Sequence, residues 1–228
     1  MDFKRKIVRK ILKYGRGFST GLARKELDAL EIASGLGGSA WLLHGLVRSL
    51  KPEVVVEIGS AQGKSACYIG MALKEIGEGK LYAIDPHTRT DWNDQGPEDT
   101  LQIMTENIKK LNLQKHVEIV RQTSVEVRAW WKLTIDMLFI DGDHSYEGVK
   151  GDWEMFSPFV RPFGVVIFHD TIWDLKPDMQ YHRADMGVPK FVDGLRAEGY
   201  PVITLERDFG VSLVQPVLQG VSLRSRRR

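Results

Sequence analysis

Polar side chains that could move protons or hold a cation follow directly after short apolar runs in this sequence. The run IDMLFI is followed by Asp141 and, three residues later, by His144. The run GVVIF is followed by His169 and Asp170. Imidazoles exchange protons near neutral pH, and imidazoles and carboxylates both bind divalent ions. The spacing therefore predicts a site for acid–base chemistry, for a cation, or for both.

A third polar segment, the loop Glu57–Ser65 with the sequence EIGSAQGKS, is compatible with three kinds of ligand. The first is a phosphate, because the loop ends in Gly-Lys-Ser like a nucleotide-binding P-loop. That pattern needs four residues between its first glycine and Gly-Lys-Ser, whereas Gly59 and Gly63 enclose three. The missing residue disfavours a nucleoside triphosphatase, since successive backbone N–H groups must wrap the phosphate.

The second ligand is a dinucleotide, because the loop is similar to the glycine turn of short-chain dehydrogenases. Tyr146 and Lys150 would supply the Tyr-x-x-x-Lys pair of that family. However, Ile58 and Ser65 stand where the family has threonine and glycine. Tyr146 also follows the loop about one βαβ unit too early. An NAD(P)-dependent oxidoreductase is kept as the alternative enzyme.

The third ligand is S-adenosylmethionine (SAM), which carries a cationic sulfonium, a ribose and an adenine. A glycine-rich turn lets the backbone approach the methionine part closely, and Glu57 suits its positive charge. Asp85, at the end of the next apolar run, can accept the ribose hydroxyls, a role that NAD sites share. Thr123 and Ser124 follow a further run, where the adenine edge is expected.

The elements that position these residues alternate between strand and helix. Apolar runs predict strands over 53–58, 81–85, 117–121, 135–141 and 164–170, with a hairpin over 201–206 and 210–215. Helices are expected from Ser65 to about Ile76 and near 189–198. The pattern predicts an α/β, Rossmann-like, doubly wound sheet of seven strands, with one antiparallel strand near the edge and helices on both faces. Ligands of such sheets bind beyond the carboxyl ends of the strands.

Four segments together resemble a class I SAM-dependent methyltransferase, and more closely methyltransferase family 24, whose relatives are catechol-type and macrocin-type O-methyltransferases. They are VVEIGSAQGKSACYI, LYAIDPH, IDMLFIDGDHSYEGVKGDWEMF and RPFGVVIFHDT, and the similarity covers roughly residues 36–215. The resemblance implies a SAM cofactor, a small hydroxylated acceptor such as a sugar or natural product, and a homodimer.

The strand ends and the resemblance together define three sets of candidate site residues. The cofactor set is Glu57, Gly59, Ser60, Gly63, Ser65, Asp85, Pro86, His87, Thr123, Ser124 and Asp141. The metal set, for Mg²⁺, Mn²⁺ or another divalent ion, is Asp141, His169 and Asp170. The catalytic set is Asp141 with His144, which stands where catechol-type enzymes carry a lysine and is expected to act as general base. Asp143 and Asp152 are expected to be a turn residue and a helix-surface charge.

Composition bounds the class of protein. The 228 residues are 43% hydrophobic and 27% charged, as in one globular domain. A single cysteine excludes an internal disulfide and favours the cytoplasm. We expect a basic helical extension over 1–35, a methyltransferase domain over 36–217 and a basic tail over 218–228. The acidic body between basic ends argues against nucleic-acid binding, and the amphipathic pattern of residues 1–16 suits either packing or weak peripheral membrane contact.

The function expected from the sequence is therefore SAM-dependent O-methylation of a small hydroxyl compound, assisted by a divalent ion. Two other interpretations stay open. One is the short-chain oxidoreductase, and the other is a protein that binds SAM without catalysis.

Overall fold

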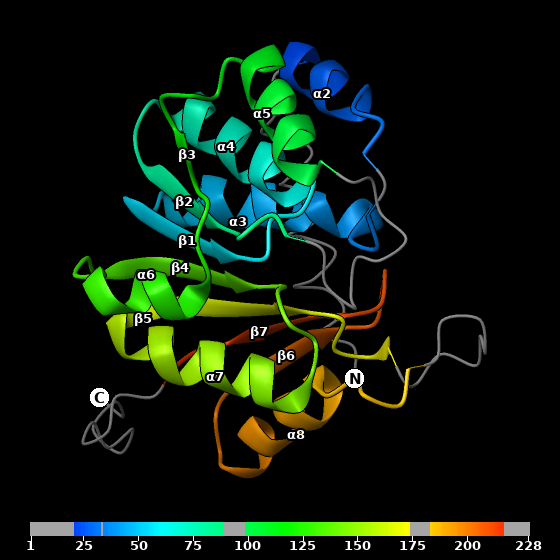
Figure 1. The fold of residues 1–228 in the computed structure, drawn as a ribbon, viewed down its shortest axis with the longest axis vertical. Helices are drawn as coiled ribbons and strands as arrows, with labels where there is room; N and C mark the ends of the chain where they lie inside the picture. The colour runs from blue at the N-terminus through cyan, green and yellow to red at the C-terminus, as the bar shows by residue number, and fades with distance from the viewer. Residues whose placement is uncertain (1–20, 33, 89–98, 174–182, 217–228) are drawn as a thin grey trace, which may run out of the picture.

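The structure is a computed structural model, and it describes residues 21–32, 34–88, 99–173 and 183–216. A single seven-stranded sheet in the order β3-β2-β1-β4-β5-β7-β6 forms its centre (Figure 1). The strands are β1 Val54–Ile58, β2 Lys80–Ile84, β3 Val117–Val120, β4 Ile135–Ile140, β5 Val160–His169, β6 Val202–Leu205 and β7 Val211–Val214. Only β7 runs antiparallel to its neighbours β5 and β6, and this confirms the predicted reversed strand near the edge.

Helices cover both faces of the sheet. Figure 1 shows α2, α3, α4 and α5 on one side and α6, α7 and α8 on the other. Their bounds are α2 Gly21–Asp28, α3 Ala40–Leu50, α4 Lys64–Ile76, α5 Thr100–Lys110, α6 Ser124–Trp130, α7 Tyr146–Phe156 and α8 Val188–Ala197, with short 3-10 helices at Gly37–Ser39 and Ser157–Phe159. The predicted doubly wound α/β fold is therefore confirmed.

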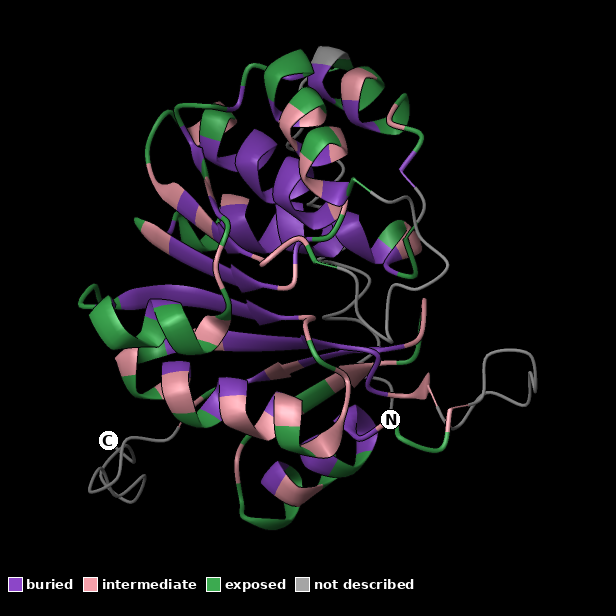
Figure 2. Cartoon of the chain, in the orientation of Figure 1, coloured by how far each residue is buried: buried purple, intermediate pink, exposed green. Residues whose placement is uncertain are grey.

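Two separate hydrophobic cores hold these layers together, because successive strand residues point to opposite faces. In β4, Met137 and Phe139 join the core under α3 and α4, whereas Leu138 and Ile140 join the core under α7 and α8. All four side chains are fully or almost fully buried, and Figure 2 shows β4 buried along its length. A continuous apolar run is thus what a strand covered on both faces requires.

The start of β5 differs from the sequence-based prediction. The strand begins at Val160 rather than at residue 164 and passes through an irregularity at Phe163, which has a φ of 70°. The pairing with β4 shifts register at this point, between Ile135 and Met137. The segment Arg-Pro-Phe-Gly has the composition of a turn, and the structure uses it as a bulge inside the strand.

Helix α2 packs on the domain through Ala23 and Leu27, which belong to the same core as α3 and α4. The predicted amphipathic stripe in residues 1–16 and the basic tail at 218–228 lie outside the described residues. Within the described ranges, no helix has the length and apolar character needed to cross a membrane.

Candidate active site

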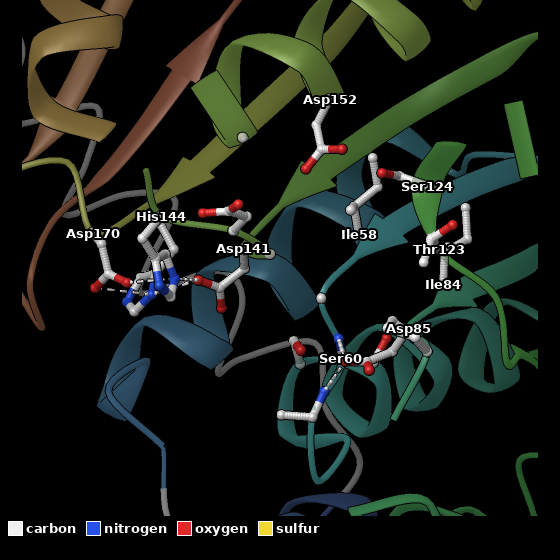
Figure 3. A pocket seen from close by; sticks show the side chains of 18 of the residues that line it. Ile58, Ser60, Ile84, Asp85, Thr123, Ser124, Asp141, His144, Asp152 and Asp170 are labelled. Carbon is white, nitrogen blue, oxygen red and sulfur yellow. Dashed lines mark hydrogen bonds and ion pairs between the residues drawn. The ribbon is translucent and has the colours of Figure 1, made fainter. Parts of the chain in front are cut away.

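The main cavity opens at the carboxyl ends of β1 and β4, where the strand order reverses. Its volume is about 630 Å³, within the range of small-molecule sites. The glycine loop after β1, the ends of β2 and β3, the loops after β4 and β5 and one face of α7 all contribute to its walls. Figure 3 shows side chains from these elements pointing into the same space. This is the position at which open α/β sheets bind ligands.

The glycine loop is folded tightly over the end of β4. Gly59 has a φ of 86°, and a Cβ atom built there would lie 2.2 Å from the carbonyl oxygen of Asp141. Only glycine tolerates this combination of dihedral angle and close approach. Gly63 caps α4 with a φ of 82° and packs against Met104, so it shapes the loop without lining the cavity.

Glu57 lies beneath the loop and does not line the cavity. Its side chain is completely buried, and the Ser60 hydroxyl donates a hydrogen bond of 2.8 Å to Oε2. Burial raises the pKa of Glu57 to about 8, against the opposing effect of Ser65 and Ser60. Glu57 therefore holds Ser60 in place from behind the cavity wall, and the raised pKa leaves its carboxyl group mostly uncharged near neutral pH.

Asp85 ties the end of β2 to the glycine loop. Its Oδ2 accepts hydrogen bonds from the backbone N–H groups of Ser60 at 2.9 Å and Ala61 at 2.8 Å. Its Oδ1 accepts one from the N–H of His87 at 2.6 Å. A carboxylate has about four acceptor positions, and three are used here, so about one stays available to a ligand hydroxyl. The ring of His87 points away from the cavity toward Thr100, and burial lowers its pKa.

Thr123 and Ser124 lie at the start of α6, on the opposite side of the cavity from the glycine loop (Figure 3). Thr123 forms a capping box with Glu126, in which the Thr123 hydroxyl accepts the Glu126 backbone N–H at the start of the helix.

The expectation that Asp152 is a helix-surface charge is wrong. Asp152 is 4% exposed, and its carboxylate lines the cavity from α7. Burial raises the pKa of Asp152 to about 6, a hydrogen bond from Ser124 partly opposes this, and Asp143 adds to it.

Two carboxylates and two imidazoles converge at the ends of β4 and β5. The Nε2 atom of His144 lies 3.4 Å from Oδ1 of Asp141 and 3.0 Å from Oδ2 of Asp170. The Nδ1 atom of His169 lies 3.1 Å from Oδ1 of Asp141 and 3.3 Å from Oδ1 of Asp170. Because the Nε2 atom of His169 lies 2.9 Å from the carbonyl oxygen of Asp208, that nitrogen must carry a proton and donate it.

The charges of this cluster support one another. Burial disfavours the charged imidazole, but hydrogen bonds and attraction to Asp141 and Asp170 outweigh it and raise the pKa of His144 to about 9. The same balance raises the pKa of His169 well above its ordinary value. In return, the imidazoles hold the pKa values of Asp141 and Asp170 below their usual range, although burial opposes this. The four side chains therefore form a partly buried cluster in which two carboxylates face two imidazoles that favour the charged form.

The structure brings most of the predicted site residues to one cavity. Those that line it are Gly59, Ser60, Ser65, Asp85, Pro86, Thr123, Ser124, Asp141, His144, His169 and Asp170. Glu57, Gly63 and His87 support its walls from behind. The face of α7 formed by Gly148, Gly151, Asp152 and Met155 also lines the cavity, and it was not among the predicted site residues. The sequence signal for this face was two glycines at helical spacing, Gly148 and Gly151, next to the single acid Asp152.

The Tyr146–Lys150 pair does not serve the cavity. The Tyr146 ring packs edge-on against Phe191, at 6.0 Å between ring centroids, and Lys150 pairs with Glu154 on the surface of α7. Neither residue lines the cavity. The arrangement that a short-chain dehydrogenase requires is therefore not formed.

A doubly wound sheet with this strand order, one reversed strand and a glycine loop at the switch point defines the class I methyltransferase fold. The family model described as a methyltransferase domain, Methyltransf_24, matches residues 56–171, half of the chain. The chain therefore belongs to this methyltransferase family, as the sequence motifs indicated.

Two curated relatives match over part of their length. The chain is 30% identical over 167 residues to the uncharacterized protein y4gI of Sinorhizobium fredii, covering 66% of this chain and 18% of that protein. It is 29% identical over 137 residues to the uncharacterized protein R132 of Acanthamoeba polyphaga mimivirus, covering 57% of each. The chain thus spans less than two thirds of either relative.

Solved structures share the fold at low sequence identity. A Staphylococcus aureus protein provisionally described as a caffeoyl-CoA O-methyltransferase has a TM-score of 0.64 and 18% identity, covering 95% of this chain and all of that one. The SAH-bound methyltransferase PaMTH1 of Podospora anserina has a TM-score of 0.64 and 14% identity, with coverages of 92% and 95%. TomG, the Streptomyces achromogenes O-methyltransferase of tomaymycin synthesis, in complex with SAM, has a TM-score of 0.60 and 18% identity, with coverages of 90% and 88%.

Proposed function

We propose that this protein transfers the methyl group of SAM to a hydroxyl group of a small acceptor. The observation that carries the proposal is that the Asp141–His144–Asp170 cluster and the glycine loop face the same cavity. Methyl transfer needs the donor and acceptor aligned in line and the acceptor proton removed. One wall of the cavity suits the first task, and the opposite wall suits the second.

The donor half of the cavity is preorganised by backbone contacts. Gly59 lets the chain pass close to a methionine group, and Asp85 fixes the loop while keeping about one acceptor position for a ribose hydroxyl. The solved relatives PaMTH1 and TomG hold SAH and SAM, which agrees with this assignment. Buried Glu57 supports this half of the cavity from beneath by accepting a hydrogen bond from the Ser60 hydroxyl.

His144 is the proton acceptor that we assign to this reaction. In the cluster it holds a proton through its two carboxylate partners, so it must first lose that proton to act as a base. A group that occupies Asp141 and Asp170 removes this stabilisation and frees the imidazole. Asp170 has a left-handed φ of 58°, an unfavourable backbone conformation of the kind that is retained at functional sites.

A divalent ion fits the same residues. Ligand atoms of Asp141, His144 and Asp170 lie within 4.8 Å of one another. This group contains His144 in place of the predicted His169. An ion held by all three would occupy the imidazole, whereas an ion held by the two carboxylates would leave His144 as the base. The Nδ1 atom of His169 lies 3.1 Å from Asp141 and 3.3 Å from Asp170, and its Nε2 donates to a backbone carbonyl as metal-ligating histidines do. When bound, such an ion lowers the pKa of the acceptor hydroxyl. The mixed nitrogen and oxygen donors favour Mn²⁺, Fe²⁺ or Zn²⁺ over Mg²⁺.

Calorimetry with SAH, NADH and ATP tests the cofactor. We expect SAH alone to bind, because the phosphate-loop spacing is wrong and the Tyr146–Lys150 pair faces elsewhere. Binding of NADH without binding of SAH would overturn the proposal.

Turnover of radiolabelled SAM with a panel of sugars, phenols and other hydroxyl compounds tests the reaction. We expect Asp170→Asn to lower methyl transfer by at least about 100-fold while SAH still binds. The matched control is Asp193→Asn, an exposed carboxylate on α8. Activity that survives both Asp170→Asn and EDTA would remove the metal role. SAH binding without turnover of any acceptor would favour the non-catalytic interpretation.

A further inference from the structure

The part of the cavity between α6 and α7 has two apolar sides and one buried acid. Ile58 and Ile84, at the ends of β1 and β2, and Val125 and Met155, on α6 and α7, supply apolar surface. Asp152 supplies the acid, and Figure 3 shows its carboxylate pointing into the cavity from α7, between Asp141 and Ser124. A flat, apolar ring with one hydrogen-bond donor at its edge matches these walls.

The helix face beside Asp152 is left open to a ligand. A Cβ atom added to Gly151 would meet no protein atom within 4 Å, although Gly151 lines the cavity in the middle of α7. Glycine in the interior of a helix is unfavourable by about 0.5–1 kcal/mol relative to alanine. Because Gly151 also lines the cavity, its open side leaves room for a flat ligand group against α7.

Asp152 itself is a buried acceptor that no basic side chain neutralises among the described residues. The groups that act on it are the Ser124 hydroxyl and the like charge of Asp143. An ionised carboxylate only accepts hydrogen bonds, so its complement in a ligand must be a donor. The exocyclic amino group of adenine is such a donor, whereas the carbonyl oxygen of a 6-oxopurine would face the carboxylate unfavourably.

We infer that Asp152 reads the adenine amino group of the cofactor and that Gly151 provides the surface against which the adenine lies. The inference rests on the proposed SAM function and adds a specificity-determining residue to it. Asp152 thereby sets the preference for an adenosyl over an inosyl cofactor. A cofactor without the amino group leaves the buried acceptor of Asp152 unpaired. The site should therefore discriminate strongly against that cofactor.

The test compares the binding of SAH with that of S-inosylhomocysteine, in which oxygen replaces the adenine amino group. We expect the wild-type protein to bind SAH about 10- to 100-fold more tightly, and Asp152→Asn to narrow this ratio to within about threefold, because an amide can serve either ring. Glu154→Gln, an exposed carboxylate on the same helix, is the matched control and should keep the wild-type ratio.

The outcomes separate this inference from the proposed function. A wild-type protein that binds both compounds equally, or an Asp152→Asn variant that keeps the wild-type ratio, overturns the role of Asp152 alone. A wild-type protein that does not bind SAH overturns the cofactor proposal itself. The wild-type comparison needs no variant, so it decides even where Asp152→Asn fails to fold.

Discussion

At the scale of single residues, Asp152 is expected to lower the stability of the free protein. Its folded pKa of about 6 exceeds the ordinary value of 3.8, so its contribution to stability falls as the pH rises from 3.8 to about 6 and stays low above that. Asparagine does not ionise. We therefore expect Asp152→Asn to raise the free energy of unfolding by about 1–3 kcal/mol near neutral pH and by less near pH 4.5.

Urea unfolding of both proteins at the two pH values measures this difference, with Glu154→Gln as the control for loss of one charge. A purely structural carboxylate would give the opposite result, since its replacement would destabilise the protein at neutral pH. A gain in stability together with lost cofactor discrimination would show that the acid is kept for binding.

Site residues that follow directly after strands were predictable from the sequence, and Asp152 was not. Asp141, Asp85 and Asp170 follow apolar runs, and parallel strands bring such ends to one edge of a sheet. Asp152 lies inside a helix, where its exposure depends on which face α7 turns toward the cavity. That rotation is set by the packing of Trp153 and Phe156 against the sheet, which the local sequence does not specify.

At the scale of elements, α7 is both a covering helix and a wall of the cavity. Gly151→Ala should stabilise the protein by about 0.5–1 kcal/mol, because alanine favours a helix and the added Cβ meets no protein atom. The same methyl group would occupy space assigned to the adenine, so we expect SAH to bind at least about tenfold more weakly. Thermal unfolding and calorimetry measure the two effects.

Gly194 in α8 provides the matched control. It is also a helical glycine with no atom within 4 Å of an added Cβ, but it does not line the cavity. Gly194→Ala should therefore stabilise the protein without changing the affinity for SAH. Equal SAH affinity in the Gly151→Ala variant and the wild type would mean that no ligand group lies against α7 at this point.

The order and type of the elements were predictable because hydrophobic period and turn residues agree along the chain. The strand β4 begins at the predicted residue and ends one residue before the predicted end, and α4 begins one residue before its predicted start. The start of β5 was wrong because a bulge and a turn share the same local composition, and only pairing with β4 distinguishes them. Long-range pairing is thus the information that the sequence pattern lacks.

At the scale of the whole molecule, the charge is unevenly distributed. Residues 1–16 hold seven Lys and Arg residues, and the last five residues hold four Arg, whereas the net charge of the chain is only +2. Basic residues near an anionic membrane surface contribute on the order of 1 kcal/mol each, and salt weakens that attraction. Weak, salt-sensitive membrane contact and packing on a second subunit are both consistent with the amphipathic pattern of residues 1–16, which lie outside the described residues.

Deletion of residues 1–16 separates these two roles, because membrane contact and subunit packing have different measurements. If the segment packs, as we expect, the shortened protein will show a changed oligomeric state by light scattering or a weaker affinity for SAH. If it contacts membranes, sedimentation with anionic vesicles at low salt will fall relative to the full chain, and high salt will abolish the difference. A shortened protein that pellets with vesicles, assembles and binds SAH like the full chain would leave neither role for this segment.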